Sequence, residues 1–406
     1  MRFSLLATSR NLPVILLFTA AAALAVTHRS GAAVNAHHGS LLQGLTSQET
    51  CSPSPGPAVY CYEVVSPTSN PNDYVYVTGI NNGQQINSAY SSSTAGPYTS
   101  SIGIPTSKTN SNLTGYGFTP EPDGSLSTYL TGLSSGHTYQ VGYQVYPTHT
   151  QGVVYDGSHW FPVQDPKQGS LTCAVTEVLG VHDSRIAVGF YETTSTSGTC
   201  IKHAFEVYSS ASDGSLSPPY TYVDLTPTDP NGGTLDVDSS AATGVNILGD
   251  VVGTVTWGSG GSQQDGSWIY RFGKYTTFCL YKSSTLYEMS HTCIPSAGAR
   301  PTYTNGINFS DLVVGDFIDS LGHQNGFALL TPWKSTAIAT VIDAANSINT
   351  VLWGVNQATG MYQDVYFTGW ATSAGAKPVG IVGYCPAGHC GSTSSPDLPR
   401  HRSERH

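Results

Sequence analysis

Short apolar runs, broken by Gly, Asn and Asp, recur along most of the chain. Each run starts with Gly, then Leu or a β-branched residue, and usually Asn. The glycine of a second motif follows nine or ten residues later, as in Val188-Gly189 and Val314-Gly315. A third apolar run contains bulky side chains, as in His203-Ala204-Phe205. These runs have the length of strands and are bounded by turn residues, so the spacing predicts strand, turn, strand and a further strand.

The pattern repeats along the chain and organises it into units. The units start at Gly79, Gly132, Gly180, Gly244, Gly306 and Gly354. The starts are 53, 48, 64, 62 and 48 residues apart, which suits one four-stranded unit with variable loops. Asp-Gly-Ser turns are expected within these units, because Asp-Gly favours two-residue hairpins. They occur at Asp123, Asp156, Asp213 and Asp265.

The ends of the repeat array predict how the sheets close. The last unit shows three strands, around 351–355, 364–370 and 379–384, and 59–65 is a strand without a unit of its own. We expect 59–65 to complete the last unit, so that radially stacked sheets form a ring with protected edges. A β-helix or a sandwich array is the competing architecture.

The ordered motifs resemble a known family. Gly-Ile-Asn, then Val-Val-Gly, then His-Ala-Phe or Gly-Phe is similar to the extracellular HAF repeat of bacterial exported proteins, seen best in 180–205 and 306–327. The resemblance covers about residues 75–385. It departs at Asn87-Ser88, where Val-Gly is expected, and in the longer gap before Thr368-Gly369-Trp370. The resemblance implies a secreted repeat protein with a β-propeller fold of about six four-stranded blades, and it brings no catalytic residues with it.

Composition supports this all-β fold and narrows the function. Charged residues make up only 10% of the 406 residues, too few to solvate several helices, whereas 44 Gly, 24 Pro and 24 Tyr suit strands and tight turns. A net charge of −10 argues against a nucleic-acid partner, because phosphate binding needs a basic surface.

The chain ends predict export. Arg2 and Arg10 precede an apolar run that ends in small residues, which is typical of a secretory signal over residues 1–25. Residues 26–50 are expected to form a linker, 51–390 a single propeller domain and 391–406 a disordered tail. We therefore expect a secreted, periplasmic or cell-surface protein with no membrane span in the mature chain, and a monomer.

The eight cysteines fit an oxidising compartment. Their order along the chain predicts four local disulfides, although other pairings are formally allowed. The proposed pairs are Cys51 with Cys61, Cys173 with Cys200, Cys279 with Cys293 and Cys385 with Cys390. The spacing does not suit structural zinc.

Several strings that could carry chemistry have structural interpretations. Gly132-Leu133-Ser134-Ser135-Gly136 matches a nucleophile elbow but falls at the turn of a repeat. The acidic loop from Asp229 to Asp238 offers oxygen ligands for calcium, yet a solvated turn explains it better. The repeat offsets of four histidines differ, so they predict no metal ring. These are His137, His182, His203 and His323.

Aromatic residues are the best candidates for ligand contacts. Trp268 and Trp353 lie in strand patterns and are expected in the core, whereas Trp257 leads into a glycine-rich loop and is the candidate binding residue. The favoured hypothesis is an extracellular binding scaffold for a glycan or protein, with no catalytic, cofactor or metal residues assigned. The alternative is a polysaccharide hydrolase or lyase with carboxylates near a central channel, which would need a carboxylate pair that the sequence does not single out.

Overall fold

The computed structural model shows a protein built from strands. It describes residues 50–53, 59–65, 72–82, 85–94, 99–107, 110–118, 125–136, 139–170, 173–212, 214–227, 237–257, 264–283, 286–291, 299–330, 337–342, 347–355, 365–373 and 376–385. All elements in these ranges are strands, which confirms the all-β prediction. The same ranges contain no helix that is long and apolar enough to cross a membrane.

Three of the antiparallel sheets contain four consecutive strands each. The first is β3 (Tyr74–Ile80), β4 (Ile86–Ser91), β5 (Thr99–Ser107) and β6 (Asn110–Phe118). The second is β7 (Ser127–Leu133), β8 (Gln140–Val145), β9 (Thr150–Tyr155) and β10 (Trp160–Val163). The third is β11 (Thr176–His182), β12 (Ile186–Thr194), β13 (Cys200–Ser209) and β14 (Tyr220–Asp224).

The next two repeats are joined into one ten-stranded sheet. One half is β15 (Val237–Val245), β16 (Val251–Trp257), β17 (Gln264–Arg271) and β18 (Lys274–Ser283). The other is β21 (Thr302–Ile307), β22 (Leu312–Ile318), β23 (Gln324–Leu330) and β24 (Ile338–Ile342). The connector β19 (Leu286–Ser290) pairs with both β18 and β24, while β20 (Ala299–Arg300) pairs with β18. The sequence motifs did not predict this joining strand.

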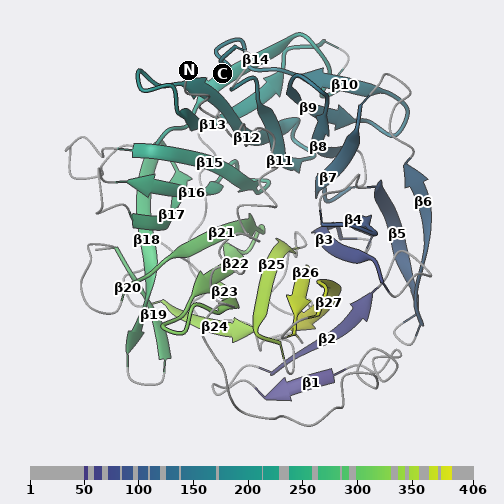
Figure 1. Ribbon diagram of the computed structural model, residues 1–406, viewed down its shortest axis with the longest axis vertical. Coiled ribbons are helices and arrows are strands. Elements are labelled where there is room, and N and C mark those ends of the chain that lie inside the picture. The colour runs from purple at the N-terminus through teal and green to yellow at the C-terminus, as the bar shows by residue number, and fades with distance from the viewer. Residues whose placement is uncertain are drawn as a thin grey trace, which may run out of the picture.

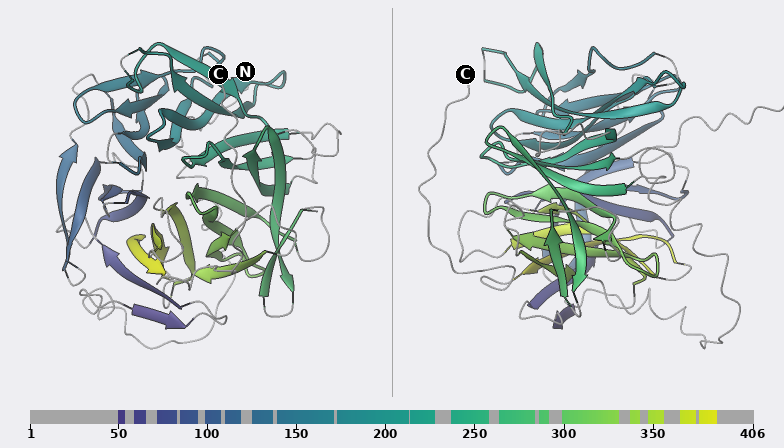
Figure 2. Two further views of the ribbon diagram at one scale, coloured as in Figure 1. Left: turned by 180° about the vertical axis from the view of Figure 1, so that it is seen from behind. Right: turned by 90° about the vertical axis from the view of Figure 1, so that its left-hand side faces the viewer.

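The last sheet combines the two ends of the described chain. Its order is β1 (Thr50–Pro53), β2 (Val59–Val65), β27 (Val379–Cys385), β26 (Val365–Thr372) and β25 (Asn349–Val355). β2 runs antiparallel to β27, with Val64 opposite Ile381, as the unassigned strand 59–65 predicted. β1 adds a fifth strand that was not expected. Figure 2 shows from behind that the purple N-terminal strands lie beside the yellow C-terminal ones.

The sheets stand around a common centre, with the first strand of each repeat innermost (Figure 1). The starting glycines of the repeats meet there in a closed ring. A Cβ on Gly354 would lie 3.0 Å from the Cα of Gly79, and one on Gly244 would lie 2.9 Å from the Cα of Gly306. Gly132, Gly180 and Gly306 make similar approaches to the next inner strand. Glycine is needed because any side chain would push these backbones apart.

The glycine of the Val-Gly motif is needed for a different reason. Each inner strand shifts register one residue before its ring glycine, as between Val178 and Gly180. The carbonyl before this bulge crowds the neighbouring strand, so that a Cβ on Gly189 would lie 1.9 Å from the oxygen of Glu177. Gly142, Gly253, Gly315 and Gly369 are equally crowded. In the first repeat Ser88 occupies the equivalent position, opposite Val77, so that repeat accommodates a small side chain there.

The asparagine two residues after the ring glycine closes the turn to the next strand. Oδ1 of Asn246 accepts hydrogen bonds from the backbone N–H groups of Leu248 and Asp250, each at 3.0 Å. Oδ1 of Asn308 accepts from Leu312 N–H at 2.9 Å in the same way. In the degenerate repeat, Oγ of Ser134 accepts from Tyr139 N–H at 3.0 Å. The repeats thus share a short polar side chain at this position, which accepts a hydrogen bond from the backbone of the turn.

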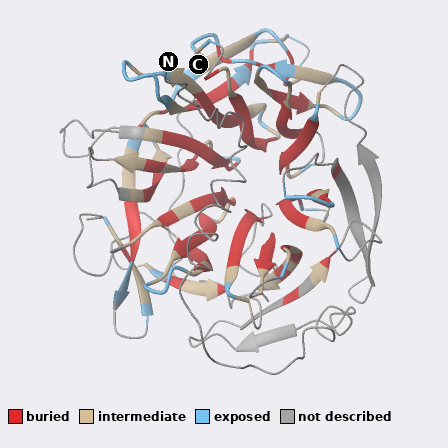
Figure 3. Cartoon of the chain, in the orientation of Figure 1, coloured by how far each residue is buried: buried red, intermediate tan, exposed pale blue. Residues whose placement is uncertain are grey.

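Apolar side chains between neighbouring sheets form the core, which Figure 3 shows in red toward the centre. Phe205, Trp268 and Phe327 come from third strands of their repeats, and each has 0% of its surface exposed. This confirms the expected core position of Trp268. Trp353 is also buried, as expected.

One predicted turn is wrong and one is confirmed. Asp156-Gly157-Ser158 is a hairpin turn, in which Asp156 Oδ1 accepts from the N–H groups of Ser158 and His159 and Gly157 has φ +94°. Asp265-Gly266-Ser267 instead lies inside β17. Asp265 and Gly266 pair with Thr256 and Val255 of β16, and the ring of Trp257 lies so close to Gly266 that a Cβ there would be 2.5 Å from it. Asp123 and Asp213 fall outside the described residues.

The disulfide prediction is confirmed at Cys173–Cys200, whose Cα atoms are 5.4 Å apart. Cys279 is also disulfide-bonded, but Cys293 falls outside the described residues, as does Cys390. Cys51 and Cys61 lie directly opposite each other in the β1–β2 pair. Residues 1–49 and 386–406, which hold the predicted signal, linker and tail, are also outside the described ranges.

Candidate functional site

The inner strands bring one bulge residue from each repeat to the central axis. These bulge residues are Thr78, Thr131, Leu179, Thr243, Asn305 and Trp353, and all of them line the central channel. The channel is a space of about 50 Å³ for the centre of a water-sized sphere.

Four polar bulge residues hydrogen-bond their inner strand to the next one. Oγ1 of Thr131 donates to the carbonyl oxygen of Val178 at 2.6 Å, and Oγ1 of Thr243 donates to that of Thr304 at 2.7 Å. Thr78 and Asn305 make the corresponding bonds to Leu130 and Leu352. These bonds satisfy buried backbone carbonyls and fix the spacing of the inner strands.

Leu179 and Trp353 break this pattern, because neither donates to the adjacent inner strand in this way. Instead, Nε1 of Trp353 donates to the carbonyl oxygen of Thr131 at 3.1 Å. Thr131 is two sheets away around the ring, so the indole reaches across the axis. Trp353 lines both the central channel and a second cavity, as do Thr78, Thr131 and Leu179.

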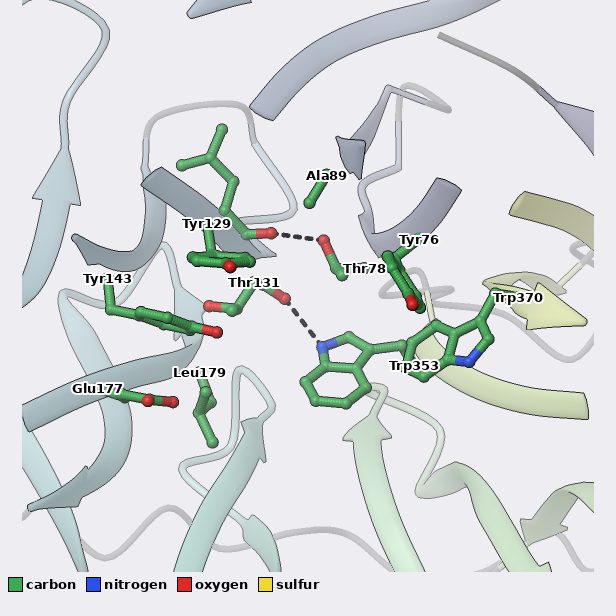
Figure 4. Close-up of a pocket in the computed structure, with 11 residues that line it drawn as sticks. Tyr76, Thr78, Ala89, Tyr129, Thr131, Tyr143, Glu177, Leu179, Trp353 and Trp370 are labelled. Atoms are coloured by element: carbon green, nitrogen blue, oxygen red, sulfur yellow. Dashed lines mark hydrogen bonds between the residues drawn. The ribbon is translucent and has the colours of Figure 1, made fainter. Parts of the chain in front are cut away.

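The second cavity, which we call the axial pocket, lies among β3, β7, β11 and β25 (Figure 4). It is a space of about 20 Å³ for the centre of a water-sized sphere. That is slightly more than the roughly 10–15 Å³ that one water needs. Five aromatic residues and one carboxyl group define it, namely Tyr76, Tyr129, Tyr143, Trp353, Trp370 and Glu177.

The aromatic rings of the axial pocket hold one another in place. Tyr129 and Tyr143 are stacked, with ring centres 4.7 Å apart. On the other side, Tyr76 meets Trp370 edge to face at 5.2 Å, and Trp353 lies 5.6 Å from Trp370. All five are at most 8% exposed, the two tryptophans being the most exposed. Rings packed in this way form a preorganised wall.

Glu177 is the single carboxyl residue among the residues that line the axial pocket. It is 2% exposed, and its Oε2 atom is buried without a hydrogen-bond partner. In Figure 4 the side chain points toward the space between Tyr143 and Leu179. Burial raises the pKa of Glu177 to about 8, an effect that Lys202 opposes and Glu192 reinforces. Burying a carboxyl group is costly, and a pKa shifted this far by burial and by neighbouring charges marks Glu177 as a functional-site candidate.

Lys202 and Glu192 extend this charge cluster along the third sheet. They lie opposite each other in the β12–β13 pair, and Glu177 is opposite Phe190 in the β11–β12 pair. Nζ of Lys202 lies 4.2 Å from the centre of the Phe190 ring. Burial lowers the pKa of Lys202, against the pull of the two carboxylates. Among the described ion pairs, none joins Lys202 to Glu177.

The residues that the sequence singled out do not gather at the axial pocket. Trp257 is partly buried and packs against the hydrophobic cluster that contains Trp268. Ser134 closes a turn between antiparallel strands, which supports the structural interpretation of the nucleophile-elbow string. The acidic loop falls outside the described ranges except for Val237 and Asp238, whose backbone belongs to β15.

The described histidines likewise each contact different residues. His182 is buried and accepts from the backbone N–H of Ser184 at 3.0 Å, and His203 contacts Thr193 through Nε2 at 2.7 Å. His323 pairs with Asp319, and His137 is not described. Within the described ranges, three or more His, Cys, Asp or Glu residues do not come together to hold a metal.

Sequence reasoning missed Glu177 and the meeting of Trp353 with Trp370. Glu177 stands three residues before its ring glycine, where the first two repeats have Tyr76 and Tyr129. A glutamate at a position where two other repeats have tyrosine is a sequence signal that could have identified Glu177. The tryptophan pair depends on closure of the ring and had no local signal.

No family model matches this chain, and no curated protein matches it either. Solved structures with related shapes include a protein of unknown function from Dyadobacter fermentans, at 10% identity and a TM-score of 0.46, covering 80% of this chain and 98% of that one. A neuraminidase-like protein of subtype N11 from a flat-faced bat influenza virus has 9% identity and a TM-score of 0.42, covering 86% and 95%. The polysaccharide lyase Uly1 has 10% identity and a TM-score of 0.34, covering 84% and 88%. At these values the likenesses carry no argument about what this chain does.

Proposed function

We propose that this protein is an exported, six-bladed β-propeller with HAF-like repeats, which binds an extracellular glycan or protein through the axial pocket. The closed ring of repeat glycines supports the blade number, and the Cys173–Cys200 disulfide supports an oxidising compartment. The structural roles of both motif glycines account for the repeat pattern. A monomer is proposed with it.

The observation that carries the binding role is the composition of the axial pocket. Five buried aromatic side chains surround a space into which one carboxyl group points. Aromatic walls with a few placed polar groups are typical of ligand sites. The space admits only a small group, so the ligand would insert one end and leave its bulk outside.

The competing hydrolase or lyase hypothesis is less well supported. Glycoside hydrolysis generally uses two carboxyl groups about 5–10 Å apart. The residues that line the axial pocket provide Glu177 alone, and those that line the central channel provide none. A single carboxyl group in an aromatic pocket fits binding better than that chemistry.

A glycan and peptide array on the mature chain, followed by titration of each hit, tests the proposed function. We expect hits whose affinity falls at least tenfold in Trp370→Ala, because that substitution removes one wall of the pocket. Trp257→Ala is the matched control and should bind normally. Turnover of a polysaccharide in a hydrolase and lyase screen, abolished by Glu177→Gln, would favour the enzyme instead.

A further inference from the structure

The chemistry of the axial pocket specifies which end of a ligand it can take. We infer that the pocket binds a primary ammonium group, carried by the glycan or protein ligand, with the Glu177 carboxylate as its counter-ion. This inference rests on the proposed function, because it names the chemical class that the same pocket recognises.

The first argument is charge. Glu177 is the pocket's only acidic residue, and its Oε2 has no hydrogen-bond partner although it is buried. An incoming ammonium would supply the missing N–H donor, and the resulting charge-assisted hydrogen bond is stronger than a neutral one. A carboxylate ligand would supply no N–H donor and, once Glu177 is ionised, would meet a like charge in a nearly dry site.

The second argument is the aromatic wall. Ring faces carry negative electrostatic potential, so that Trp and Tyr attract cations, most strongly where water is excluded. The pocket's five rings are at most 8% exposed, which meets that condition. A ligand group that was merely apolar would use the rings but would leave the Glu177 oxygen unsatisfied.

The third argument is size. The space slightly exceeds that of one water, which suits a primary ammonium head. The hydroxyl groups of Thr78 and Thr131 also line the pocket. Each hydroxyl already donates its proton to a backbone carbonyl, and so its lone pairs remain available to accept from ammonium. Together with Glu177, these oxygens offer up to three acceptors for three N–H donors.

Methylammonium is a direct probe, with methanol as an uncharged probe of similar size. Binding is followed by saturation-transfer NMR at pH 9, with potassium chloride keeping the ionic strength constant. At that pH the Glu177 carboxyl is mostly ionised, since burial raises its pKa to about 8, and an alkylamine is still mostly charged. The other titratable groups around it are Glu192 from β12, Lys202 from β13, and Tyr76, Tyr129 and Tyr143 from β3, β7 and β8.

We expect methylammonium to bind at least roughly tenfold more tightly than methanol, as expected for a desolvated cation among rings. Glu177→Gln keeps the shape and should remove most of that preference. The matched control is Asp316→Asn, since Asp316 is also fully buried but accepts from Asn305 and Gln324 and does not line the pocket. Thermal unfolding of each variant confirms that it is folded.

The outcomes separate this inference from the proposed function. Equal binding of methylammonium and methanol, or an unchanged preference in Glu177→Gln, overturns the ammonium inference. Array ligands that bind through Trp370 but carry no amine overturn it too, and leave the proposed function standing. Array ligands that bind Trp370→Ala as tightly as the natural chain overturn the proposed site itself.

Discussion

The indole Nε1 of Trp353 donates to the carbonyl oxygen of Thr131 across 3.1 Å, although a whole sheet stands between their two inner strands. The pair therefore ties the end of the chain to its second repeat. Both residues also line the axial pocket and the central channel. One side chain thus serves the ring and the pocket together.

Trp353→Ala should merge the two spaces and lower the free energy of unfolding by about 3–5 kcal/mol, as for other large-to-small core substitutions. Trp353→Phe keeps much of the packing but loses the donor, which should cost at least about 1 kcal/mol. Urea unfolding measures both. An unchanged free energy of unfolding in Trp353→Phe would show that the Trp353–Thr131 hydrogen bond contributes nothing to stability.

Gly253 should not tolerate alanine, because the backbone of Ala241 and the ring of Trp268 both lie against it. Gly253→Ala would place its Cβ 2.1 Å from the carbonyl oxygen of Ala241, and we expect little folded protein in a secretion or solubility assay. Gly249→Ala is the control, since Gly249 has φ +77° and open space around it. That change should cost only about 1–2 kcal/mol, from backbone strain. Equal loss in both variants would contradict the crowding argument.

Removal of residues 51–65 should cause a large loss of stability and aggregation, because it leaves the edge of β27 unpaired. Removal of residues 391–406, the tail predicted from the sequence, should change little and provides the matched truncation. Thermal unfolding and size-exclusion chromatography compare the two. A monomer with an unchanged melting temperature after the first truncation would rule out closure through β2.

The pKa of Glu177 predicts a pH effect on stability. Its folded-state pKa is raised to about 8 from a normal value of 4.5, so the unfolded chain releases this proton first. The contribution of Glu177 is complete below pH 4.5 and declines as the pH rises to about 8, at up to roughly 1.4 kcal/mol per pH unit. Denaturant melts at pH 5, 6.5 and 8 should show a shallower decline for Glu177→Gln than for the natural chain. The same decline of stability with pH in both proteins would show that folding does not shift the pKa of Glu177.

Peptide mapping without reduction should recover Cys173–Cys200 together with three further local links, Cys51–Cys61, Cys279–Cys293 and Cys385–Cys390. The first of these three is favoured by the strand register, which places its two residues opposite each other. Free thiols at most of these positions, or links between distant repeats, would contradict the local scheme.

Much of the fold follows from the sequence because its strongest constraints are local. Ring glycines such as Gly244 and crowded glycines such as Gly253 are imposed by backbone contacts, so their spacing reports the inner strands directly. The β-forming run 59–65 lacked a local partner, and that absence predicted the pairing with the last sheet. Asp265 misled the turn prediction because Asp-Gly also occurs in a strand where a tryptophan lies against the glycine.

The candidate site was less predictable, since its residues are neighbours only after the ring closes. Trp353 and Trp370 come from the last repeat, and Tyr129 and Tyr143 come from the second. Trp257 looked available because its flanking glycines suggest a loop, yet its ring packs on Gly266. Local pattern shows where a strand lies, but not which distant side chain fills the space beside it.

The pairing of β2 with β27 also orders events in time. A ribosome makes β2 before the strands of the other four sheets and β27 after them, so β2 must wait for its partner. Folding that depends on such a distant contact is slow, because a long loop must close before the contact forms. The ring can therefore shut only after β27 has been synthesised.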